Sequence, residues 1–194
     1  TDYAQKILLV GHGSHSTNNL HAAGLDCGAC GGQTGEVNVR VLASLLNDPE
    51  VRKQLQSRDM ALPNDCQFVA ALHNTTTDEI TLFDSSLNPT MARWLQTATK
   101  QAQQERLQHI DPSLANASHN QINRAYQKRA NDWSQVRPEW GLANNAAFIV
   151  APRNWTRDAD LKGRSFLHDY QWQHDTEFAL LELIMTAPMI VTNW

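Results

Sequence analysis

The sequence Lys-Ile-Leu-Leu-Val at residues 6–10 is an apolar run that leads directly into Gly-His-Gly at 11–13. A short apolar run that ends at glycine is typical of a buried strand. Seven of the nine glycines lie between Gly11 and Gly35, so the backbone there must adopt positive φ or approach another segment closely. A helical pattern begins near Glu36. A loop between a strand and a helix is where α/β proteins place functional residues.

This glycine-rich loop carries donor atoms that suit zinc. His12 supplies an imidazole nitrogen, and Cys27 supplies a sulfur that a metal would hold as a thiolate. Asp26 is positioned either to orient a ligand or to hydrogen-bond to loop amides, and Cys30 is a further soft donor. Because two or three ligands do not complete a tetrahedral site, two alternatives stay open. They are a glycine-rich turn with inert cysteines, and a redox pair formed by Cys27 and Cys30.

Two more residues are candidates for lining the same site. His73 follows a strand expected at 67–72, so it should emerge at the same edge of a parallel sheet as His12. Arg40 lies in the second turn of the helix expected at 36–46. The alternative for His73 is a local turn in which polar side chains satisfy backbone groups, and the alternative for Arg40 is a solvated surface.

The composition is that of a globular protein. Hydrophobic residues make up 41% of the 194 residues, which is enough for one domain with a core. A net charge of -4 argues against a general nucleic-acid-binding protein. The three cysteines form no spaced disulfide framework, which suits a reducing compartment. The chain starts at Thr1 without methionine and stops just after an apolar segment, so we expect a fragment of a longer protein.

Hydrophobic periodicity predicts strands that alternate with helices. The strands are expected at 6–10, 67–72, 80–83, 147–151 and 165–170, and the helices at 36–46, from 49, from 89 to Pro112, at about 114–133 and after Asp175. This order favours a mostly parallel sheet flanked by helices, in a single α/β domain over 1–194. The polar helices at about 89–133 are interpreted as an insertion. The basic residues in these helices are interpreted as a face exposed to solvent. The helix expected from 89 to Pro112 should carry an apolar stripe formed by Met91, Trp94, Leu95, Ala98 and Ala102.

Several longer motifs resemble the DabA family of inorganic carbon transporter subunits. Around the glycine-rich loop they are Gly-His-Gly-Ser at 11–14 and Leu-Asp-Cys-Gly-Ala-Cys-Gly-Gly-Gln-Thr-Gly-Glu-Val-Asn at 25–38. Further along they are Ala-Leu-His-Asn-Thr-Thr-Thr-Asp-Glu at 71–79, Arg-Pro-Glu-Trp-Gly-Leu-Ala-Asn-Asn-Ala-Ala-Phe at 137–148, Gly-Arg-Ser-Phe-Leu-His at 163–168 and Leu-Glu-Leu-Ile-Met-Thr-Ala-Pro-Met at 181–189. Together these motifs span nearly the whole chain.

The resemblance implies a β-carbonic-anhydrase-like core in which one zinc ion is held by an upstream Cys-x-Asp pair and by a downstream His and Cys. The downstream pair matches His12 and Cys27, whereas the upstream pair is absent from this sequence. The chain is therefore expected to be the C-terminal part of that core and to carry half of the ligands. By itself we expect it to be inactive and to bind zinc weakly or not at all.

The function that the resemblance implies is zinc-dependent hydration of carbon dioxide to bicarbonate within an energy-coupled uptake complex. The implied partner is a membrane subunit related to proton-translocating antiporters, DabB. The implied location is peripheral, on the cytoplasmic face of the cell inner membrane. Two other hypotheses remain from the residues: a thiol redox protein, and a docking module without chemistry that contacts a membrane partner through 178–191.

Overall fold

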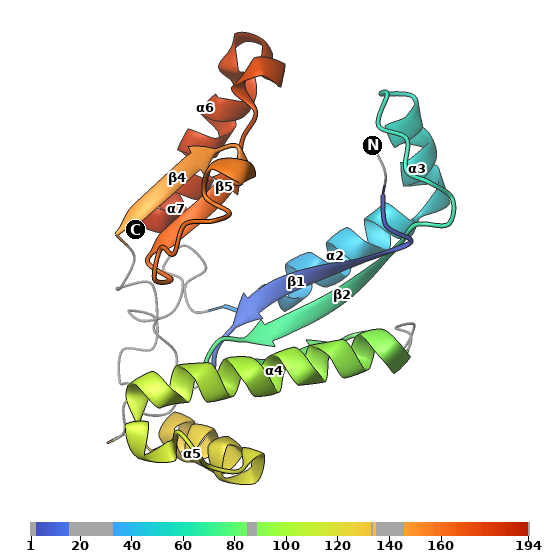
Figure 1. Cartoon of the computed structure of the whole chain (residues 1–194). Coiled ribbons are helices and arrows are strands. Elements are labelled where there is room, and N and C mark those ends of the chain that lie inside the picture. Colours follow the sequence, from blue (N-terminus) through green and yellow to red (C-terminus); the bar gives the residue numbers. More distant parts are fainter. Residues whose placement is uncertain (1–2, 16–32, 85–88, 133, 135–145, 194) are drawn as a thin grey trace. The chain divides into compact units, whose positions relative to one another are not determined.

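The computed structural model describes residues 3–15, 33–84, 89–132, 134 and 146–193. The chain divides into two compact units: the described residues up to 134 belong to the first, and those from 146 onward to the second (Figure 1). Among the described residues, no helix has both the length and the apolar character needed to cross a bilayer.

The first unit is built on a three-stranded sheet in the order β1-β2-β3. Strand β1 (Lys6–Gly13) lies parallel to β2 (Gln67–Asn74), and β2 is antiparallel to β3 (Glu79–Leu82). Both parallel strands extend beyond the apolar runs that predicted them, because their last residues still pair, from Gly11 with Leu72 to Gly13 with Asn74.

Helices α2 (Glu36–Asn47) and α3 (Pro49–Gln56) connect β1 to β2, as the sequence predicted. The Asp48 side chain accepts hydrogen bonds from the backbone N–H groups of Glu50 and Val51, at 2.9 and 3.0 Å. A carboxylate cap followed by proline at the first helical position starts a new helix, so the chain turns at this point.

Helix α2 covers one face of the sheet (Figure 1). The core between them contains Ala43 of α2 together with Phe68 and Ala70 of β2, and Ile7 and Leu9 of β1 pack against it. Because side chains alternate along a strand, these contacts fix which residues of β1 and β2 face α2 and which face the other side of the sheet.

Helices α4 (Pro89–Ile110) and α5 (His119–Asn131) form a second core in the same unit. It contains Leu107, Ile122 and Tyr126, each at most 2% exposed. The apolar stripe expected on α4 does not form this buried face, since Trp94 is 64% exposed. The buried side of α4 instead includes Gln103, which hydrogen-bonds to the turn after β2.

The second unit contains β4 (Ala147–Ala151) and β5 (Ser165–Asp169), which are parallel, and helices α6 (Ala179–Thr186) and α7 (Pro188–Asn193). The Asp175 carboxylate accepts the N–H groups of Leu180 and Leu181, each at 2.9 Å, and so caps α6 as its sequence position predicted. The predicted α/β fold, with mostly parallel strands and flanking helices, is confirmed, and the strands form two sheets in which only β3 is antiparallel to its neighbour.

Candidate functional site

The carboxyl ends of β1 and β2 bring two histidines together. His12 pairs with His73 in the parallel register. Ile7 and Leu9 face α2, so alternation directs the His12 side chain to the opposite face, and the same holds for His73 relative to Ala70. Both imidazoles therefore project from one face at the end of the sheet where α/β proteins place their sites.

Backbone hydrogen bonds hold the segment around His12 in place. The Gly35 N–H donates to the His12 carbonyl at 2.8 Å, which ties the start of α2 to β1. On the other side, Thr75 donates twice to the Gly13 carbonyl, from its N–H at 2.8 Å and from its hydroxyl at 2.9 Å. The end of β1 is thus fixed between α2 and the turn that follows β2.

Gly11 is required for this close approach. A Cβ at position 11 would lie 2.8 Å from the Gly35 carbonyl oxygen, which belongs to the backbone and cannot rotate away. We therefore expect Gly11→Ala to destabilise the chain by about 1–3 kcal/mol, the usual cost of overpacking. Urea unfolding of the two proteins measures the difference.

Gly13→Ala is the matched control for this prediction. A Cβ at position 13 would lie 3.0 Å from Cγ2 and 3.2 Å from Cβ of Thr34, which are side-chain atoms and are farther away than the Gly35 backbone is from position 11, so its cost should be smaller. Equal stabilities of the Gly11→Ala and wild-type chains would contradict the close approach.

A buried carboxylate lies beside His73. Oδ1 of Asp78 is 3.0 Å from Nε2 of His73 and 3.3 Å from Nη2 of Arg106. The Asp78 side chain is 3% exposed, whereas the His73 side chain is 33% exposed. Arg106 also donates to the Thr75 carbonyl at 3.2 Å. The imidazole is thus anchored from the protein interior and reaches the surface.

Helix α4 holds the turn that carries Asp78. The Thr99 hydroxyl donates to the Asp78 carbonyl at 3.0 Å, and the Gln103 side-chain amide donates to the Thr77 carbonyl at 2.7 Å. The Tyr126 hydroxyl of α5 then donates to the Gln103 carbonyl at 3.1 Å. Burial, and next the nearby charge of Asp78, raise the pKa of the Tyr126 phenol above its usual range. The phenol therefore stays protonated as a donor.

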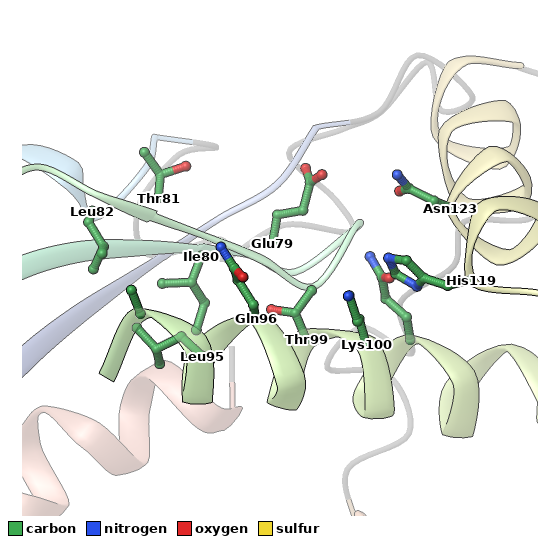
Figure 2. Close-up of a pocket in the computed structure, with 12 residues that line it drawn as sticks. Glu79, Ile80, Thr81, Leu82, Leu95, Gln96, Thr99, Lys100, His119 and Asn123 are labelled. Carbon is green, nitrogen blue, oxygen red and sulfur yellow. The ribbon is translucent and has the colours of Figure 1, made fainter. Parts of the chain in front are cut away.

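A cavity of about 400 Å³ lies between β3, α4 and α5 (Figure 2). One end is apolar, with Ile80 and Leu95, and the other is polar, with Glu79, Lys100 and His119. Neither candidate histidine of the β1–β2 end is among its lining residues. The cavity is therefore distinct from that site.

The other predicted site residues are placed as follows. Arg40 lies on α2, where it pairs with Glu36 at 2.9 Å and stacks over the Phe83 ring. Asp26, Cys27 and Cys30 lie outside the described residues. Within the described part of the chain, no three His, Cys, Asp or Glu side chains gather closely enough to hold a metal ion.

Sequence reasoning missed the roles of Asp78 and Arg106. The segment after β2 was open to interpretation as a local turn, and the basic residues of the helical pair were interpreted as a solvated face. Arg106 is instead 24% exposed and paired with Asp78, because α4 packs against that turn. The one available signal was the carboxylate in His-Asn-Thr-Thr-Thr-Asp at 73–78. No local pattern distinguishes Arg106 from its polar neighbours.

Comparison with known proteins identifies relatives over the whole chain. A family model described as "Probable inorganic carbon transporter subunit DabA" matches residues 1–194. Curated proteins of that name are 60% identical in Marinomonas sp. (strain MWYL1) and 59% identical in Hydrogenovibrio crunogenus, in each case over 100% of this chain. A third, from Methylovorus glucosotrophus, is 57% identical over 100% of the chain.

The chain covers 25%, 23% and 23% of those three relatives, so it spans about a quarter of their length. No solved structure matches it. The family match extends from the first residue to the last and includes both strand ends that carry His12 and His73. On this evidence, the chain belongs to the DabA family of probable inorganic carbon transporter subunits.

Proposed function

We propose that this chain is part of the zinc-dependent, carbon dioxide-hydrating subunit of an energy-coupled inorganic carbon uptake complex. The observation that carries the proposal is the position of His12 at the exposed carboxyl end of β1 in a chain of this family. The relatives' names supply the transport of inorganic carbon, and the donor atoms of the glycine-rich loop supply the zinc chemistry.

The donor set fits zinc in kind. His12 offers an imidazole, which is a common zinc ligand, and Cys27 would add a thiolate. His12 lies near the carboxyl end of β1, where the Gly35 N–H holds its backbone carbonyl, and Cys27 follows it in the sequence before α2 begins. When bound, zinc would lower the pKa of a coordinated water to about 7 and so provide hydroxide at neutral pH. The remaining ligands would come from outside this chain.

The partner and location follow from the same proposal. A transporter subunit acts with other subunits, and we propose the antiporter-related membrane protein DabB as the partner, with peripheral attachment at the cytoplasmic face of the membrane. The docking hypothesis placed this contact at 178–191. Leu183 is 62% exposed and Ile190 is 54% exposed, so both are available to a partner or to the rest of the protein. Their exposure does not favour docking over hydration.

Zinc content of the full-length protein tests the proposal. We expect about one zinc ion per chain in the wild type and none in His12→Ala or Cys27→Ala, because a tetrahedral site cannot lose a direct ligand without losing affinity. His174→Ala, which alters an exposed histidine in the second unit, is the control and should retain the metal. Zinc retained at the wild-type level in both the His12 and the Cys27 variants would overturn the proposal.

A further inference from the structure

We propose that Asp78 is a positioning residue that holds His73 as a hydrogen-bond acceptor for an O–H group at the inorganic carbon site beside His12. The inference rests on the proposed function, since it assigns a role in that same site. It adds two residues, His73 and Asp78, that the zinc donor set does not include.

The first step is the shared face of the sheet. His12 and His73 are directly opposite each other in a parallel pair, and both side chains point away from α2. Whatever binds next to the His12 imidazole therefore lies within reach of the neighbouring strand. His73 is the residue that this strand presents there.

The second step is the direction of the hydrogen bond. A carboxylate only accepts hydrogen bonds, so the N–H of His73 Nε2 donates to Asp78 Oδ1, 3.0 Å away. In a neutral imidazole with its proton on Nε2, the other nitrogen, Nδ1, is an acceptor. No hydrogen bond joins Nδ1 of His73 to any other described residue. The carboxylate thus selects the tautomer that offers a lone pair.

The third step is rigidity. Arg106 lies 3.3 Å from the same carboxylate oxygen and offsets its charge in the interior. Thr76 and Thr77, which precede Asp78, are at most 1% exposed, and α4 hydrogen-bonds to the turn through Thr99 and Gln103. One edge of the imidazole is therefore fixed by buried groups, while a third of the side chain remains exposed.

The fourth step is the chemistry of the ligand. An acceptor nitrogen complements an O–H donor. Bicarbonate and water each carry one, whereas carbon dioxide carries none. His73 therefore suits the hydrated side of the reaction, as an acceptor for the O–H of bicarbonate or of the water that forms it. Its loss should lower the maximal rate of uptake more than it changes the concentration for half-maximal uptake.

The test is a double-mutant cycle in the full-length complex, with His73→Gln, Asp78→Asn and the double variant. We expect each single change to lower the maximal uptake rate by about 10-fold, the low end of the cost of losing a partner that orients a site. Zinc content should stay at the wild-type level. Because Asp78 acts through His73, the double variant should be no slower than His73→Gln alone.

Asp111→Asn is the matched control, since Asp111, between α4 and α5, also pairs with an arginine, Arg129, at 3.2 Å. It should leave the uptake rate unchanged. The proposal is overturned if the His73→Gln complex takes up inorganic carbon at the wild-type rate. It is also overturned if adding Asp78→Asn to His73→Gln lowers the uptake rate as much as Asp78→Asn lowers it in the wild type.

His73→Gln decides the question even if Asp78→Asn fails to fold, because His73 is partly exposed and Arg106 still pairs with the Asp78 carboxylate when the imidazole is replaced. The two proposals also fail differently. Wild-type uptake and zinc in His12→Ala would refute the zinc site itself. Loss of both in His12→Ala, with wild-type uptake in His73→Gln, would refute only the role of His73 and Asp78.

Discussion

Uptake of inorganic carbon by the full-length complex is expected to fall more than about 100-fold when His12 is replaced by alanine. Losing a partner that only orients a metal ligand costs about 10–100-fold in affinity or activity, and losing the ligand itself should cost more. The backbone around His12 is held by Gly35, whose bond to the His12 carbonyl does not depend on the imidazole. The variant should therefore fold and lack the imidazole.

Labelled bicarbonate uptake by cells that depend on this complex measures the effect. His174→Ala serves as the control and should leave uptake unchanged, because this histidine is exposed in the second unit. Comparable amounts of protein in all strains must be shown by immunoblot. Uptake at the wild-type level in His12→Ala would remove this residue from the reaction.

Stability should respond most strongly to the loss of Tyr126. The Tyr126 side chain is fully buried between α4 and α5, beside Leu107 and Ile122. Replacing a buried aromatic residue by alanine leaves a cavity, and the usual cost is about 3–5 kcal/mol. We expect Tyr126→Ala to lower the free energy of unfolding by about that amount, as measured by urea unfolding followed by circular dichroism.

Two further variants separate the causes of this loss. Tyr126→Phe removes only the hydroxyl that donates to the Gln103 carbonyl, and we expect a cost of about 1 kcal/mol. Trp94→Ala removes a larger aromatic residue from the exposed side of α4 and should change stability by less than about 0.5 kcal/mol. If Trp94→Ala were as damaging as Tyr126→Ala, the assignment of the buried face of α4 would be wrong.

Much of the first unit was predictable because its signals are local. The apolar run before Gly11 predicted β1, and the Asp48-Pro49 pair predicted the break between α2 and α3, where the carboxylate caps the new helix. The length of α4 was also predictable, since its start at Pro89 and its end before Pro112 depend on backbone chemistry within a few residues. The buried face of α4 was not predictable, because it depends on what the helix packs against.

The candidate site divides along the same line. The sequence by itself identified His12 beside the glycine-rich loop and His73 at the end of the next parallel strand. It also identified the family to which the chain belongs. Only the tertiary structure decided that Asp78 and Arg106 join His73. Arg106 is 28 residues from Asp78 in sequence, and no periodicity links residues that far apart. Their pairing exists because α4 packs across the turn after β2, so that an arginine from a polar helix meets a buried carboxylate.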